Sequence, residues 1–133
     1  MSYTNNPLSI LSGTGITVSP TVGTGANTIT LSSSGISSFA VRIATATPIT
    51  VDGTTDDIIS VEVPGPVPVA VTLPAGVAGA SFTIKDGLGL ASVVTPITIT
   101  PTAGTIDGAP TAVISAPYGA LTFIYDGIQW LIV

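Results

Sequence analysis

The sequence predicts an all-β protein, and three observations support this prediction. From residue 39 onward, short apolar segments rich in Val, Ile and Thr follow one another closely, as they do in β-sandwiches and barrels. Asp-Gly pairs begin at residues 52, 86, 107 and 126, and such pairs favour hairpin turns because both residues tolerate positive φ. No segment has apolar residues at helical spacing without Gly, Pro or β-branched residues, so we expect almost no helix.

The expected strands form an N-terminal pair and a C-terminal series. The pair covers residues 13–20 and 26–32, where apolar residues alternate with Thr and Ser as in half-buried strands. The series covers residues 39–43, 58–63, 67–73, 81–85, 97–100, 112–114, 121–125 and 129–133. The last three Asp-Gly pairs recur about every 20 residues, which indicates hairpins rather than the repeat of a solenoid. We therefore expect an antiparallel β-sandwich or jelly-roll-like domain.

A Ser-rich break near residue 34 separates an extended N-terminal β arm, residues 1–37, from that domain, residues 38–133. A chain of 133 residues supports one core. Two short strands are marginal alone in water, so the arm must lie against its own domain, a sister chain or a partner. We interpret it as a segment for attachment or strand exchange. Its candidate contact residues are Ile10, Ile16, Val18, Ile29 and Leu31.

The aromatic residues suggest a core and one surface contact. The expected core residues lie within apolar strands; they are Phe82, Ile84, Phe123 and Trp130. Tyr118 lies instead in the turn-like segment Ala-Pro-Tyr-Gly. It is a candidate surface contact for a sugar or a protein, and simple turn packing is the alternative.

Charge is scarce in this chain. Charged residues make up 7%, with two cations, seven carboxylates and a net charge of −5, whereas about a quarter of a typical soluble domain is charged. A surface built mainly from Ser, Thr, Gly and Pro suits burial against other proteins. No basic cluster could neutralise several phosphates, so nucleic acid is a poor partner. No apolar run approaches the roughly 18–20 residues of a membrane span, and the N-terminus lacks the features of a secretory signal, so we expect a chain made and kept in the cytoplasm.

The sequence offers little to catalysis. It has neither His nor Cys, which excludes Ser-His-Asp triads, Cys-His pairs and the usual zinc sites. We expect no enzyme, no catalytic residue, no cofactor and no metal. The densest acidic segment holds Asp52, Asp56 and Asp57. It could supply a carboxylate pair for glycoside cleavage or oxygen ligands for a cation such as Ca²⁺, but neighbouring Asp residues on a loop point in different directions. A solvated turn is the simpler interpretation, and cation binding by this loop stays open.

Four motifs carry a resemblance to a known group of proteins: FTIKDG at 82–87, ITITP at 97–101, GTIDG at 104–108 and YGALTFIYDGIQW at 118–130. Together they resemble the β-rich domains of tailed-bacteriophage fibres, spikes and capsid decoration proteins, where similar strands and hairpins recur in this order. The resemblance covers about half of the chain. Residues 15–18 and 27–31 resemble the shaft or arm segments of the same proteins.

The resemblance implies a virion structural protein, commonly a homotrimer, that is attached by its N-terminal part. The chain departs from the fibres and spikes in lacking a long shaft, a catalytic acid pair and a His-rich tip. These departures favour a capsid decoration (cement) protein or head fibre that binds the major capsid protein on the capsid exterior. The alternative is a short tail-fibre or receptor-binding module that recognises the host surface. Neither role involves a membrane or nucleic acid.

Overall fold

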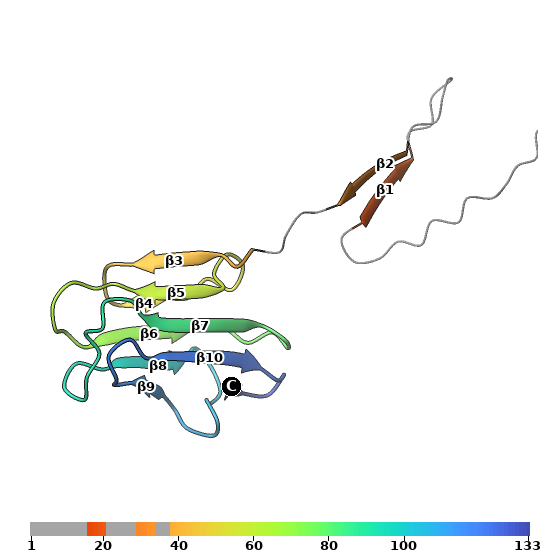
Figure 1. The fold of residues 1–133 in the computed structure, drawn as a ribbon. Coiled ribbons are helices and arrows are strands. Elements are labelled where there is room, and N and C mark those ends of the chain that lie inside the picture. Colours follow the sequence, from red (N-terminus) through yellow and green to blue (C-terminus); the bar gives the residue numbers. More distant parts are fainter. Residues whose placement is uncertain (1–15, 21–28, 34–37) are drawn as a thin grey trace, which may run out of the picture. The chain divides into compact units, whose positions relative to one another are not determined.

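The computed structural model describes residues 16–20, 29–33 and 38–133. The chain divides into two compact units, Met1–Ser38 and Phe39–Val133, one residue beyond the boundary placed from the sequence. Every regular element in the described ranges is a strand (Figure 1), which confirms the all-β prediction. Because these ranges contain no helix, they contain no helical membrane span.

The N-terminal unit contains one antiparallel pair of strands, β1 (Ile16–Pro20) and β2 (Ile29–Ser33). The register aligns Val18 with Leu31 and Thr17 with Ser32, so like residues are opposite each other at these positions, whereas Ile16 is opposite Ser33. Four of the five candidate arm residues belong to this pair, and Ile10 lies outside the described residues.

The C-terminal unit is built from two sheets (Figure 1). The five-stranded sheet has the order β11-β10-β7-β5-β3 and comprises β3 (Val41–Ala44), β5 (Ile58–Val61), β7 (Ser81–Asp86), β10 (Ala120–Tyr125) and β11 (Trp130–Ile132). The four-stranded sheet has the order β4-β6-β8-β9 and comprises β4 (Ile49–Thr50), β6 (Val69–Leu73), β8 (Ile97–Pro101) and β9 (Ala112–Ile114).

From β3 to β8 the chain winds as a coil of three turns. Each strand is followed by one in the other sheet, so that β3, β5 and β7 run parallel in one sheet and β4, β6 and β8 run parallel in the other. The prediction of an antiparallel sandwich is therefore wrong for this region. The reason is that sheet neighbours here are two strands apart along the chain, a separation that strand patterns do not reveal.

The remaining ladders are antiparallel, as the sequence predicts: β8 pairs with β9, β7 with β10, and β10 with β11. Only two of the four Asp-Gly pairs make the expected turns. Asp107 and Gly108 have φ values of 47° and 77° in a tight turn between bridged residues, and Gly127 has a φ of 105° in the β10–β11 hairpin. The pairs at 52 and 86 lie instead in crossings between the sheets.

One apolar core lies between the two sheets and takes residues from both. The strands alternate as half-buried strands should; in β6, Val69, Val71 and Leu73 are buried while Ala70 is exposed. The four residues that the sequence places in the core lie in it: Phe82, Ile84, Phe123 and Trp130 are at most 3% exposed. Burial of a side chain of this size stabilises the fold by about 1.5–3 kcal/mol.

Candidate functional site

A buried carboxylate at the end of β7 fixes two loops. Asp86 is 2% exposed and accepts four backbone hydrogen bonds, from the N–H groups of Gly89 (3.0 Å), Leu90 (3.3 Å), Ala91 (3.0 Å) and Tyr118 (3.1 Å). Burial by itself would raise the pKa of Asp86, but the four donors together hold that pKa below its usual value. One carboxylate thus ties the β7–β8 crossing to the turn that precedes β10.

Tyr118 is held at the surface by its neighbours. Its N–H donates to Asp86, and its carbonyl accepts a hydrogen bond from the Lys85 ammonium group. The Lys85 Nζ also lies 5.7 Å from the centroid of the Tyr118 ring, within the range of a cation–π contact. The backbone of Tyr118 has a φ of 57°, which is uncommon for an aromatic residue and persists only where the surroundings impose it.

The ring of Tyr118 lies against Gly89, where an added Cβ would collide with it. Gly89 also has a φ of 71°, so this position favours glycine for two reasons. We call the group of Lys85, Asp86, Gly89 and Tyr118 the Tyr118 corner. Tyr118 is 63% exposed, so the corner presents an aromatic ring that its own side-chain and backbone contacts keep in place.

A shallow hollow of about 220 Å³ adjoins this corner. It is lined by residues 113–116, at the end of β9, and by residues 119–121, at the start of β10. Its volume is below the roughly 300–1,000 Å³ typical of small-molecule sites. It is large enough for one side chain or one sugar ring, and Ala116 and Gly119 in its lining flank Tyr118 in the sequence.

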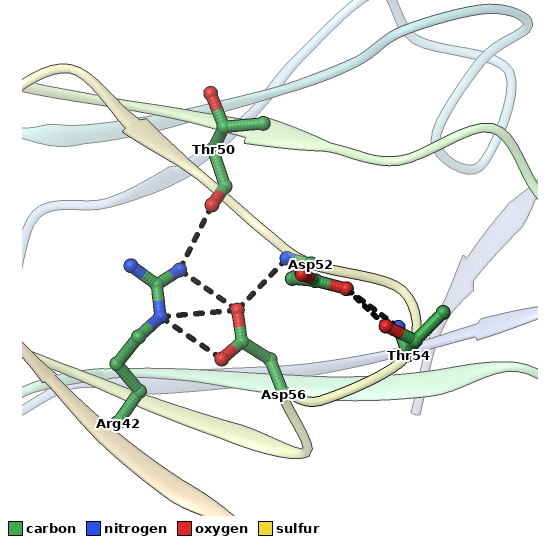
Figure 2. A network of polar contacts seen from close by, with 5 residues as sticks. All are labelled: Arg42, Thr50, Asp52, Thr54 and Asp56. Carbon is green, nitrogen blue, oxygen red and sulfur yellow. Dashed lines mark hydrogen bonds and ion pairs between the residues drawn. The ribbon is translucent and has the colours of Figure 1, made fainter.

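The carboxylates of the acidic loop between β4 and β5 accept hydrogen bonds from other groups of the protein, as Figure 2 shows for Asp52 and Asp56. Asp56, 5% exposed, accepts hydrogen bonds from Nε and Nη2 of Arg42 at 2.8–3.1 Å and from the N–H of Asp52 at 2.8 Å. Arg42 also donates to the carbonyl of Thr50 on β4 at 2.8 Å. The guanidinium group of Arg42 therefore links β3 to β4, which are edge strands of the two sheets.

The other two carboxylates of this loop have separate partners. Asp52 accepts hydrogen bonds from the hydroxyl and N–H groups of Thr54, which hold the pKa of Asp52 below its usual value. Asp57 accepts a bond from the N–H of Ala40. The three carboxylates face different donors, so they form neither an acid pair across a cleft nor a shared cation site, and no such metal-binding group of acidic side chains occurs in the described ranges.

The four other carboxylates also accept hydrogen bonds within the unit. Besides Asp86, they are Glu62, from the Ser60 hydroxyl; Asp107, from the N–H of Ile132; and Asp126, from the N–H groups of Ile128 and Gln129. All seven carboxylates of the chain, and both cations, thus have partners inside the C-terminal unit. The sequence did not single out Asp86 or the pairing of Arg42 with Asp56. Charged residues are rare in this chain, so a charged residue within or next to an apolar strand is a signal that could have identified Asp86 and the Arg42–Asp56 pair.

Several large apolar side chains of the C-terminal unit are exposed. They include Phe39, Val41, Ile43, Val77, Val93, Val94, Ile128 and Val133.

In comparisons with known proteins, no family model and no curated sequence matches this chain.

Proposed function

We propose that the chain is a structural component of a tailed-bacteriophage virion, a capsid decoration (cement) or head-fibre protein that binds the major capsid protein on the capsid exterior. One observation carries the proposal. Every carboxylate and both cations of the chain have hydrogen-bond or ion-pair partners within the C-terminal unit, while large apolar side chains are exposed on its surface. Such a surface gains free energy by docking, while its carboxylates and cations already have partners within the unit.

The two units divide the work under this proposal. The N-terminal unit attaches to the shell, since the two-stranded sheet that its described residues form can be stabilised by adding to a neighbour. The C-terminal unit stays outside and assembles as a homotrimer, which is the state that the resemblance to phage proteins implies. The protein acts by binding, not as an enzyme, and without nucleic acid or membrane.

The copy number of the protein in purified virions tests this proposal. A decoration protein occupies repeated shell positions and should be present in many tens of copies per particle. It should also rebind to stripped heads and protect them against heat. A quantitative gel of purified particles measures the first quantity, and a heat-release assay on stripped heads measures the second. A few copies per particle, with no rebinding to heads, would contradict the proposal.

The Tyr118 corner favours a second candidate function, a short tail-fibre or receptor-binding module for the host surface. Its exposed aromatic ring is suited to a carbohydrate or protein contact, and two neighbours of Tyr118 in the sequence, Ala116 and Gly119, line a hollow of the size of a sugar ring. Under this alternative, Tyr118→Ala should lower binding to host cells at least about tenfold. The same substitution should leave attachment to stripped heads unchanged, so the two assays separate the functions.

A further inference from the structure

The end strand β3 differs from the other three end strands of the two sheets. Natural end strands are usually short, or carry proline or lysine, so that they do not pair with other chains. β4 has two residues and follows Pro48, β9 has three residues between Pro110 and Pro117, and β11 has three residues. β3 has four residues without proline or lysine. It is the longest of the four end strands.

Among the described residues, no strand pairs with the outer edge of β3, and this edge is also apolar. The carbonyls of Ala40 and Ala44 accept hydrogen bonds from Ile58 and Glu62 on the β5 side. In a parallel ladder, alternate residues face the same neighbour. The backbone groups of Val41 and Ile43 therefore point away from β5, toward the free edge.

The side chains at this edge are exposed and uncharged. Phe39, Val41 and Ile43 are 75%, 61% and 61% exposed. The one charge of the strand, Arg42, is bound to Asp56 and Thr50 on its other face. A row of three apolar side chains beside unpaired backbone groups is suited to adding a strand.

We propose that β3 pairs antiparallel with β3 of a second copy of this chain, about a two-fold axis at Val41. The segment from Phe39 to Ile43 is self-complementary in this register. Val41 meets Val41 of the second copy, and Phe39 meets Ile43, so that each apolar residue faces an apolar residue. The outward backbone groups of Val41 and Ile43 gain partners, and the two five-stranded sheets become one.

Charge selects this register over its neighbour. Pairing centred on Arg42 would place two guanidinium groups directly opposite each other, which is unfavourable. Centring on Val41 places Arg42 opposite Ala40 and keeps both Arg42–Asp56 pairs intact. The contact is isologous, so it closes with two copies. It adds to the proposed virion role, because it can join copies that belong to neighbouring trimers, and it does not depend on that role.

Single cysteines test the register directly, because the full-length chain has no cysteine of its own. In hydrogen-bonded antiparallel pairs, opposite Cα atoms lie about 5.5 Å apart, within reach of a disulfide. Under mild oxidation, Phe39→Cys mixed with Ile43→Cys should cross-link at least about tenfold faster than Phe39→Cys mixed with Val93→Cys, because pairing raises the effective concentration. Val93 is the control because it is 84% exposed and lies in the β7–β8 crossing. Equal rates for the two mixtures would overturn the proposal.

A charge substitution provides an independent readout of assembly. Val41→Lys places two like charges opposite each other across the axis and should weaken self-association at least about tenfold in sedimentation. Val93→Lys should leave self-association unchanged, and both variants should keep the unfolding midpoint of the parent chain. If Val41→Lys instead leaves self-association intact and abolishes binding to stripped heads, the edge takes a strand of the shell protein, and pairing with a second copy is wrong.

Discussion

The coil from β3 to β8 and the antiparallel segment from β9 to β11 use the same kinds of residue in different ways. In the antiparallel segment, Asp-Gly pairs make turns in which Gly108 and Gly127 have positive φ. In the coil, Asp86-Gly87 starts a crossing, where Asp86 caps the loop and a Cβ at Gly87 would collide with Ser60 and Glu62. Glycine is needed there for close approach rather than for its backbone conformation. The same dipeptide therefore marks a change of direction but does not specify which strand comes next to which.

The two regions nevertheless form one folding unit. β7 lies between β5 of the coil and the antiparallel β10, and β8 lies between β6 and β9. The core residues of both regions belong to one cluster. We therefore expect a single cooperative unfolding transition, since the core residues of the two regions pack in one cluster.

The largest expected effect tests that cooperativity. Trp130→Ala in β11 should lower the free energy of unfolding by about 3–5 kcal/mol, and Ile59→Ala in β5 by about 2–5 kcal/mol, because both side chains are fully buried. Trp130 also packs at an angle against Phe82 and Tyr125, with ring centroids 5.6 and 5.2 Å away. Chemical denaturation followed by circular dichroism measures both changes.

In each of these variants, fluorescence and circular dichroism should report one coincident transition. Two separate transitions in either variant would show that the coil and the antiparallel segment fold independently. A change below about 1 kcal/mol for Trp130→Ala would place this side chain outside the core.

The next effect concerns Asp86, which joins the two regions. Asp86→Asn replaces one acceptor oxygen by an NH₂ group that faces backbone donors, and should cost about 1–3 kcal/mol. The cost has a pH dependence. Because the pKa of Asp86 is lowered in the folded state, its stabilising contribution is complete above the unfolded pKa of about 3.9 and is lost as pH falls through the folded pKa.

Denaturation midpoints measured between pH 7 and pH 2 check this dependence. The parent chain should lose stability below about pH 4, and Asp86→Asn should show a smaller loss over the same range. Equal acid sensitivity of the two proteins would mean that Asp86 does not contribute in the way described.

The smallest expected effect on stability is that of a substitution at Arg42, on the edge strand β3. Arg42→Met keeps the length of the side chain but leaves the buried Asp56 with the N–H of Asp52 as its donor. We expect a loss of about 1 kcal/mol, since Arg42 is itself partly exposed to solvent. Lys85→Met, on β7, is the matched control because Lys85 forms no ion pair with a buried carboxylate, and its effect should be smaller. Denaturant titration of the two variants ranks them, and the reverse order would contradict the role given to Asp56.

Part of the fold follows from the sequence and part does not. Alternation in segments such as residues 69–73 identifies a half-buried strand, and Phe82, Phe123 and Trp130 identify the core, because both depend on local patterns. The parallel pairing of β5 with β7 depends on which strands become neighbours after two crossings. No local pattern encodes that choice, so the antiparallel prediction failed at this point.

The site shows the same limit. The turn-like segment around Tyr118 marked it as a surface contact, and its ring is exposed. No sequence pattern connects it with Asp86, which is 32 residues away along the chain and accepts a hydrogen bond from its N–H group. The ion pair in the acidic loop was not predicted for a related reason. Its partner Arg42 lies on another strand, so Asp56 looked free for a cation when an ion pair occupies it.

Attachment to stripped heads measures the central claim, that this protein acts by docking, most directly. The full chain and a variant that lacks residues 1–35 should be compared for fold by circular dichroism and for binding by co-sedimentation with the heads. We predict that the shortened chain keeps the strands of the C-terminal unit and their unfolding midpoint but no longer binds. Unimpaired binding of the shortened chain would contradict the account.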